Sequence, residues 1–437
     1  MSVIKTKTLI AAAVLVSGAA ILAQPAYATE GYFQHGYGTA AKGMAGAGVA
    51  APQDTQAAVN NPAGMRGLGN RVDGALSLFS PIRQYDAKRA EVFIADKDHE
   101  SESNIFLVPS LGASWDMGSY SLGLTLSANG GMNTDYDSKV FAGGTDPRTG
   151  VDLTQAFIGA TYAVELNKSN TIGITPTFAM QRFAAKGLQG FASISSDSAN
   201  LTNRGHDFFW GGGVRVGWLN RTTDKLTLGL TAQSRMWMTK LDKYKGLFAE
   251  QGGFDIPPAV TVGGSYKATD KLTINADYKR IFYSTVDSIA NTLTNVRPFH
   301  TGAGGTANAN SLGGDNGVGF GWQDVNIFKL GGQYVYSDAL TLRAGVAHNT
   351  DPFEGTETLF NILAPAVVNT HLSVGATYSI SPAMNLNFAF THAFAADITG
   401  ANVNHASVTA LGGSGTAHQI ELEMYQNDLE IGLTYKF

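Results

Sequence analysis

A strict alternation of apolar and polar residues near the end of the chain constrains its fold more than any other feature. In the stretch DLEIGLTYKF, 428–437, large apolar residues occupy every second position, with charged or small residues between them. The apolar set is Leu429, Ile431, Leu433, Tyr435 and Phe437. Because successive side chains of a β-strand point to opposite faces, the pattern predicts a strand with one apolar and one polar face. The same pattern recurs at 225–235, 339–348 and 384–392.

The composition indicates which surroundings such strands would have. Only 15% of the 437 residues are charged, 52 are Gly and none is Cys. Beyond the first 28 residues no run reaches the roughly 18 consecutive apolar residues that a membrane helix needs. Low charge, abundant Gly and alternation are typical of a β-barrel with lipid outside and water or a plug inside. The net charge of −5 gives no reason to expect nucleic-acid binding.

Connections of two lengths alternate between the predicted strands. Six short turns fall at 116–119, 167–170, 220–225, 268–271, 336–339 and 380–383. Seven longer loops fall near 80–103, 129–151, 185–206, 239–255, 285–321, 350–366 and 398–426. Short turns at one end and long loops at the other are typical of outer-membrane barrels. We therefore predict an all-β fold, a transmembrane antiparallel β-barrel of about fourteen strands spanning 70–437. The alternative is a soluble β-sandwich or barrel.

The first 28 residues carry the features of a secretory signal peptide. Lys5 and Lys7 precede an apolar run from Leu9 to Leu22, and Ala26-Tyr27-Ala28 fits the cleavage rule for small residues. A transmembrane anchor is the alternative, but the apolar run is short for one. The predicted location is the outer membrane of a Gram-negative bacterium.

Residues 29–69 do not alternate, and they predict a compact hatch inside the barrel. A fourteen-strand barrel leaves a lumen roughly 18 Å across, which two or three short helical turns would nearly fill. The segment is rich in Ala and Gly and ends at Asn61, Pro62 and Ala63, residue types that set a fixed turn. A disordered N-terminal tail is the alternative.

The segment GYFQHGYGTAAKGMAGAGVAAPQDTQAAVNNPAGM resembles the start of the FadL family of outer-membrane transporters for long-chain fatty acids and other hydrophobic compounds. FDIPPAVTVGGSYKATDKLTINADY resembles a segment from the middle of that family's barrel. The resemblance implies a fourteen-stranded barrel, an N-terminal hatch containing Asn-Pro-Ala, and sideways release of cargo through a gap at an inward kink of the third strand.

The third predicted strand loses its alternation at Asn129, Gly130 and Gly131. Glycine inside a strand marks a bulge or a break, so we predict a kink at these residues. The alternative is that the strand simply ends there and a loop begins.

Apolar clusters in the predicted loops are candidates for capturing a ligand. They comprise Leu247, Phe248, Phe254, Leu359 and Phe360, and Phe33 of the hatch joins them as a further candidate. Apolar clusters in extracellular loops are expected either to be covered by other residues or to bind a ligand. The alternative is that they pack against each other as loop cores.

A cargo with a carboxylate would need a cation inside the barrel. Arg215, Arg235, Lys329 and Arg343 fall at inward positions of their predicted strands. The alternative is that they pair with acidic neighbours or with the hatch backbone. A hydrocarbon cargo would need none of them.

These features together predict passive uptake of hydrophobic small molecules, most of all long-chain fatty acids. Transport of aromatic or aliphatic hydrocarbons is the first alternative, and a general porin for polar solutes is the second. No catalytic or metal-binding motif is present, so we expect no enzyme activity, metal or cofactor. We expect a monomer in contact with outer-membrane lipid and lipopolysaccharide, and recognition of Phe437 by the barrel-assembly machinery.

Overall fold

A computed structural model describes residues 30–87, 94, 98–129, 131–293, 309–402 and 418–437. The predicted signal peptide, 1–28, lies outside the described residues, as does Gly130.

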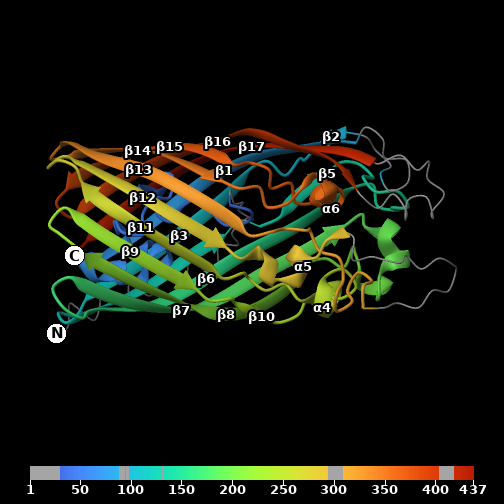
Figure 1. Cartoon of the computed structure of the whole chain (residues 1–437), viewed down its shortest axis with the longest axis horizontal. Helices are drawn as coiled ribbons and strands as arrows, with labels where there is room; N and C mark the ends of the chain where they lie inside the picture. The colour runs from blue at the N-terminus through green and yellow to red at the C-terminus, as the bar shows by residue number, and fades with distance from the viewer. Residues whose placement is uncertain (1–29, 88–93, 95–97, 130, 294–308, 403–417) are drawn as a thin grey trace.

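The described residues form one antiparallel sheet that closes on itself (Figure 1). Its strands are β1 (Arg71–Ala87), β2 (Asp98–Glu100), β3 (Phe106–Asp116), β4 (Tyr120–Asn129), β5 (Asn133–Tyr136), β6 (Thr149–Glu165), β7 (Asn170–Lys186), β8 (Asp207–Arg221), β9 (Leu226–Gln233), β10 (Trp237–Met238), β11 (Ala259–Lys267), β12 (Leu272–Ile281), β13 (Val325–Ser337), β14 (Leu340–Asn349), β15 (Thr370–Ser381), β16 (Met384–Asn402) and β17 (His418–Lys436).

Neighbouring strands of the sequence pair with each other, and β1 closes the ring by pairing with β17 from Arg71–Lys436 to Ala87–Ile420. The short strands β2, β5 and β10 continue the positions of β3, β4 and β9 in the wall. The seventeen labelled strands therefore make a barrel of fourteen strand positions, as predicted. The six predicted short turns all join consecutive strands and lie at one end of the barrel, where the C-terminus also lies (Figure 1).

The long loops at the other end carry short helices. These are η2 (Gln189–Ile194), η3 (Ser198–Asn200), η4 (Asp242–Tyr244), α4 (Ala249–Gly252), η5 (Tyr283–Thr285), α5 (Asp287–Ala290), η7 (Gly355–Glu357) and α6 (Thr358–Asn361). Among the described residues no helix is long and apolar enough to cross a membrane. Aromatic and aliphatic side chains of these loops form a large buried core with residues at the loop ends of the strands.

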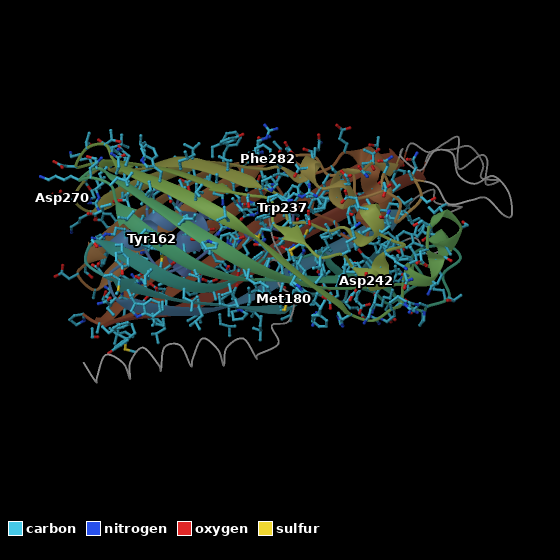
Figure 2. The ribbon with its side chains drawn as sticks, turned by 90° about the horizontal axis from the view of Figure 1, so that it is seen from below. Tyr162, Met180, Trp237, Asp242, Asp270 and Phe282 are labelled. Carbon is cyan, nitrogen blue, oxygen red and sulfur yellow. The ribbon has the colours of Figure 1, made fainter. Side chains whose placement is uncertain are left out.

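The two faces of the wall follow the alternation of the sequence. In β17, Ile431, Leu433 and Tyr435 are exposed on the outside, whereas Glu430 and Thr434 are buried inside. Figure 2 shows other outward side chains, including Tyr162, Met180 and Trp237. Because unpaired backbone groups are costly in hydrocarbon, a closed sheet with an apolar outer face suits the membrane interior.

Residues 30–69, which we call the hatch segment, lie inside the barrel. They form α2 (Thr39–Lys42), α3 (Ala57–Asn60) and η1 (Pro62–Gly67), and most residues from 30 to 65 are buried. Glycines of the wall let the segment approach closely: a Cβ at Gly331 or Gly345 would overlap Met44, and one at Gly432 would overlap Thr39. Further hatch contacts involve Gly112, Gly123, Gly173, Gly217, Gly229, Gly263 and Gly375.

Several strands run further than the sequence indicates. β1 continues to Ala87 through the start of the predicted loop 80–103, because its polar residues pair with β17 along their whole length. β5 occupies part of the predicted loop 129–151, and the ends of β16 and β17 extend into the predicted loop 398–426. The predicted loops 80–103 and 398–426 therefore begin several residues too early.

Candidate functional site

The hydrogen-bond ladder between β3 and β4 stops partway along both strands. Pairing runs from Asp116–Ser121 to Leu111–Leu126 and ends there, although β3 continues to Phe106 and β4 to Asn129. The two edges meet again where the Glu102 amide donates to the Asp135 carbonyl oxygen, 2.8 Å away. We call the described residues between these points, 103–110 facing 127–129 and 131–134, the seam.

The kink predicted at Asn129, Gly130 and Gly131 borders this seam. Asn129 pairs with Gln155 and Asn133 pairs with Asp152, so three residues of one strand face two of the next. This extra residue makes a β-bulge, and β5 then continues the pairing with β6. β4 itself ends at Asn129, and the kink at these residues stays a prediction. Gly131 lies too close to the Leu153 carbonyl oxygen to accept a Cβ.

Pro109 accounts for part of the interruption. In the register of Leu111 and Leu126, Pro109 would lie opposite Ala128. Proline has no N–H, so it cannot donate to the Ala128 carbonyl oxygen. The Gln34 side-chain amide of the hatch segment donates to that oxygen instead.

The hatch segment supplies further hydrogen bonds to the seam and its lower end. Gln56 Nε2 donates to the carbonyl oxygens of Leu111 (3.1 Å) and Leu126 (3.2 Å), and the Tyr37 hydroxyl donates to Asn129 Oδ1. All these bonds are made by neutral groups.

From Asn129 a row of buried amides crosses the wall toward the loops. Asn129 Nδ2 donates to Gln155 Oε1 (3.2 Å), and Gln155 Nε2 donates to Gln181 Oε1 (2.7 Å). Gln181 Nε2 then donates to the Phe254 carbonyl oxygen at 2.9 Å. The row links the seam to a loop that carries three of the candidate capture residues.

Buried ion pairs hold other faces of the hatch segment. Lys42 Nζ lies 2.8 Å from Asp428 Oδ2 and 2.6 Å from Glu430 Oε2, both on β17. Glu30 lies 2.6 Å from Lys279 Nζ and 2.5 Å from Lys329 Nζ. All six side chains are close to fully buried. Since an unpaired buried charge is strongly unfavourable, these contacts fix the position of the segment.

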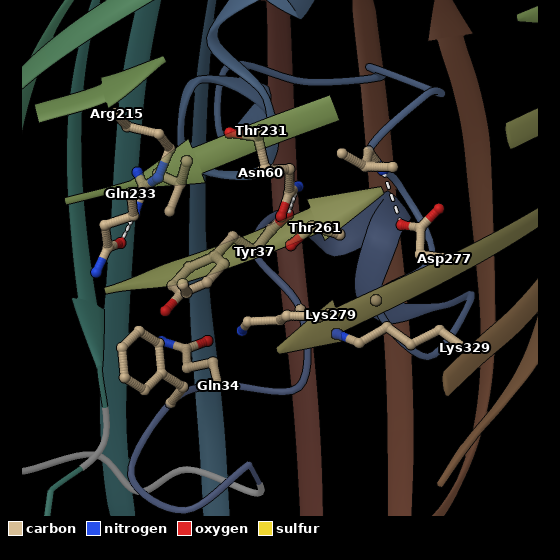
Figure 3. Close-up of a pocket in the computed structure, with 16 residues that line it drawn as sticks. Gln34, Tyr37, Asn60, Arg215, Thr231, Gln233, Thr261, Asp277, Lys279 and Lys329 are labelled. Carbon is tan, nitrogen blue, oxygen red and sulfur yellow. Dashed lines mark hydrogen bonds between the residues drawn. The ribbon is translucent and has the colours of Figure 1, made fainter. Parts of the chain in front are cut away.

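A cavity of about 50 Å³ separates the hatch segment from the wall beside Arg215 (Figure 3). Tyr37 and Gln34 line it from the hatch segment, and Arg215 and Lys279 line it from the wall. Arg215 is buried and donates to Gln233 Oε1, and no carboxylate of the described residues forms an ion pair with it. Arg215 is thus a buried cation that faces a cavity without an acidic partner.

The other three candidate cations have partners. Lys329 also donates to the His35 carbonyl oxygen (2.6 Å), and Arg343 donates to Gln53 Oε1 (2.6 Å) and Thr377 Oγ1 (2.7 Å). Both hold the hatch segment.

Arg235 does not lie at the predicted inward position of its strand. The wall carries one extra residue between Gln233 and Trp237, because Arg215 pairs with Gln233 and Gly212 pairs with Trp237. This bulge shifts the alternation, and Arg235 pairs with Asp255 at 2.6 Å near the loops. Arg235 therefore lies beyond the end of β9, near the loops, and its contact with a ligand stays a prediction.

The candidate capture residues are brought together in the loop core. Phe248 lies 4.8 Å from both Phe254 and Phe183, and Phe360 lies 5.0 Å from Phe191, between ring centroids. Phe33 stacks on Tyr32 at 5.4 Å, and Lys279 lies over its ring. Leu247 and Leu359 are also buried in this core. The residues thus form a loop core, and a role in ligand capture remains a prediction.

The Asn-Pro-Ala turn joins the hatch segment to the barrel. Asn61 Oδ1 accepts from the Ala63 amide (3.1 Å) and caps η1, where Pro62 occupies the first turn. Asn61 Nδ2 donates to the carbonyl oxygens of Val49 (2.9 Å) and Trp218 (3.0 Å). One side chain therefore bonds to its own turn, to the hatch segment and to β8.

A larger cavity of about 710 Å³ borders the loop end of the seam. Ser103, Phe106 and Asn133 line it at the seam, and Asp152 and Arg182 line it on β6 and β7. Its size falls within the usual range for small-molecule sites.

Sequence reasoning missed Arg83, Pro109, Gln34 and Gln56. Arg83 fell in a predicted loop, and the two glutamines looked like ordinary polar residues of the hatch. Proline inside a strand was a usable signal, since proline is confined to edges, strand starts and bulges. Among the described residues no group of three or more His, Cys, Asp or Glu side chains could hold a metal ion.

Comparison with known proteins places this geometry in context. The toluene transporter TodX of Pseudomonas putida has a TM-score of 0.67 at 16% identity, over 92% of this chain and 99% of that one. A FadL homologue of Pseudomonas aeruginosa has a TM-score of 0.67 at 16% identity, over 93% and 100%. These likenesses establish a shared fold.

A 47 kDa outer membrane protein of Pasteurella multocida (strain Pm70) is 24% identical over 303 residues. That match covers 62% of this chain and 66% of the relative, slightly less than two thirds of its length. The family described as "Outer membrane protein transport protein (OMPP1/FadL/TodX)" matches residues 19–437. The closed fourteen-stranded barrel is consistent with this match, and the chain belongs to the OMPP1/FadL/TodX family of outer-membrane transport proteins.

Proposed function

We propose that the protein takes up hydrophobic small molecules passively and releases them sideways through the seam. The observation that carries the proposal is the interrupted ladder between β3 and β4, whose edges are held by side chains instead of strand pairing. Side-chain contacts can exchange without dismantling the barrel. The apolar loop core would capture cargo, and the hatch segment would block a direct aqueous route.

Apolar cargo favours such a lateral route on energetic grounds. Burying one CH₂ group is worth about 0.8 kcal/mol, so a sixteen-carbon chain gains on the order of 10 kcal/mol by leaving water. A path from loop core to bilayer keeps the cargo out of water. The cavities around the hatch segment, of about 50, 20 and 10 Å³, support this proposal over a general porin.

Arg215 supports a more specific proposal, that the cargo carries a carboxylate, as a long-chain fatty acid does. The arginine is buried beside a cavity and forms no ion pair among the described residues. A carboxylate would supply the missing charge with bidentate geometry. Transport of hydrocarbons is the alternative. It is supported by the printed names of the structural neighbours, which include toluene transporters and a monoaromatic hydrocarbon channel.

Uptake by an Arg215→Met variant separates the two cargo classes. In a strain that lacks its own transporter, we expect fatty-acid uptake to fall at least about tenfold, the effect of losing one charged hydrogen-bonded contact. Toluene uptake should stay unchanged. Arg221→Met, at an exposed strand end, is the matched control. Equal fatty-acid uptake by wild type and Arg215→Met would contradict the carboxylate proposal, and steady ion conductance of the wild type would favour a porin.

A further inference from the structure

Arg83 connects the two edges of the seam from inside the barrel. Its residue is 2% exposed, and it belongs to β1, the strand next to β3. Nη1 donates to the Asn133 carbonyl oxygen on one edge, and Nη2 donates to the Ser103 carbonyl oxygen on the other. The guanidinium carbon also lies 5.9 Å from the centroid of the Phe106 ring.

The chemistry of arginine suits this position. Where a ladder is interrupted, backbone carbonyls lose their strand partners and still need donors when they are buried. A guanidinium presents several N–H groups in a rigid planar fork, so it can serve two carbonyls at once. A lysine ammonium is a point charge on a flexible stem and is less suited to bridging two fixed oxygens.

The described contacts of the hatch segment with the seam do not bridge its two edges. Gln34 bonds to Ala128 and Tyr37 bonds to Asn129, but each of these contacts joins the hatch segment to one edge only. Phe79, Phe106, Val108 and Ala128 fill the space with apolar contacts, which can slide apart. Arg83 therefore ties one edge of the seam directly to the other, and just beyond the loop end of the seam Arg148 pairs with both Glu102 and Asp135.

We propose that Arg83 is the latch of the seam: a positioning residue that holds the two edges together and sets how often they separate. The proposal rests on the proposed function only where it concerns cargo. The latch itself is a statement about the closed wall, and it can be measured without cargo.

A buried cysteine at the seam provides the measurement, because the natural chain contains no Cys. Val108→Cys places a thiol at a buried position on the β3 edge, and Ile105→Cys places one at an exposed position nearby. Each variant is reconstituted in phospholipid vesicles and labelled with a lipid-soluble maleimide. Labelling of Val108→Cys should be slow, and labelling of Ile105→Cys should be fast.

Arg83→Met should increase the labelling rate of Val108→Cys at least about tenfold, since two charge-assisted hydrogen bonds are lost. Arg83→Lys should give an intermediate rate, and it provides the reading if Arg83→Met does not fold. Arg280→Met, which removes an arginine paired with Asp324 at the loop end of β12, should leave the rate unchanged. An unchanged rate in the folded Arg83 variants would overturn the latch.

Uptake measured on the same variants keeps the two proposals apart. Faster labelling with faster uptake of hydrophobic cargo supports both the latch and the lateral route. Faster labelling with unchanged uptake supports the latch and overturns the lateral route. Unchanged labelling overturns the latch whatever the uptake rate is.

Discussion

The hatch segment is held in different ways on its two sides. Toward β12, β13 and β17, buried ion pairs of Glu30 and Lys42 anchor it. Toward the seam, its contacts are hydrogen bonds from Gln34, Tyr37 and Gln56, and small cavities lie nearby. Breaking a buried ion pair leaves an uncompensated charge, whereas a neutral hydrogen bond exchanges at lower cost. We infer that any movement of the segment takes place on the seam side and pivots on the charged side.

Removing the charged anchor should have the largest effect. Lys42→Met leaves Asp428 and Glu430 buried without their cation, which should weaken docking of the hatch segment by about 3–5 kcal/mol. We expect ion conductance in planar bilayers where the wild type shows little. Lys42→Arg keeps the charge and should stay closed.

Arg215→Met tests the side of the hatch segment that has no buried ion pairs, again by ion conductance in planar bilayers. Its removal leaves no carboxylate unpaired among the described residues, so conductance should remain close to the wild-type level. Equal conductance of Lys42→Met and Arg215→Met would show that the two sides do not differ as inferred.

A smaller effect is expected from closing the seam. Pro109→Ala restores an N–H opposite the Ala128 carbonyl oxygen, and one additional hydrogen bond contributes about 1 kcal/mol. Uptake of hydrophobic cargo should fall about fivefold in transport assays, which corresponds to that free energy.

Pro176→Ala is the matched control, because Pro176 also lies in the wall, on β7, and none of the described hydrogen bonds joins it to the hatch segment. If Pro176→Ala reduced uptake as much as Pro109→Ala, strand pairing in general would limit transport, and the seam would have no special role.

The smallest effect on transport should come from Glu357, a loop residue outside both regions. Burial raises the pKa of Glu357 to about 7, and its carboxylate accepts from the Leu293 amide at 3.0 Å. A folded-state pKa above the usual value means that the protonated form is favoured in the folded loop. Stability is therefore present at low pH and is lost as the pH rises from about 4.5 through about 7.

Limited proteolysis of the loop between pH 5 and pH 8 measures this dependence. Wild-type cleavage should accelerate toward pH 8, and Glu357→Gln should show a flat profile. A wild-type profile that is equally flat would contradict the assignment.

The strand faces and the short turns could be predicted from the sequence because they depend on residues that are close together in the chain. Alternation in 428–437 predicted the faces of β17, and turn residues predicted all six short connections. The parts that failed depend on register. One extra residue near Gln233 shifts the strand alternation just before Arg235, and pairing with β17 made a strand of the polar stretch around Arg83. A seam exists only between two strands, so neither strand alone reveals it.

The glycines that face the hatch segment have a consequence for exchange between relatives. Gly345, Gly375 and Gly432 leave no room for side chains because Met44, Gly43 and Thr39 already occupy that space. The inner wall is thus complementary in shape to this particular hatch segment, and the complementary positions lie on strands far apart in the chain. A hatch segment grafted from another family member would not fit the positions of these glycines. The hatch segment and the inner face of the wall must therefore change together.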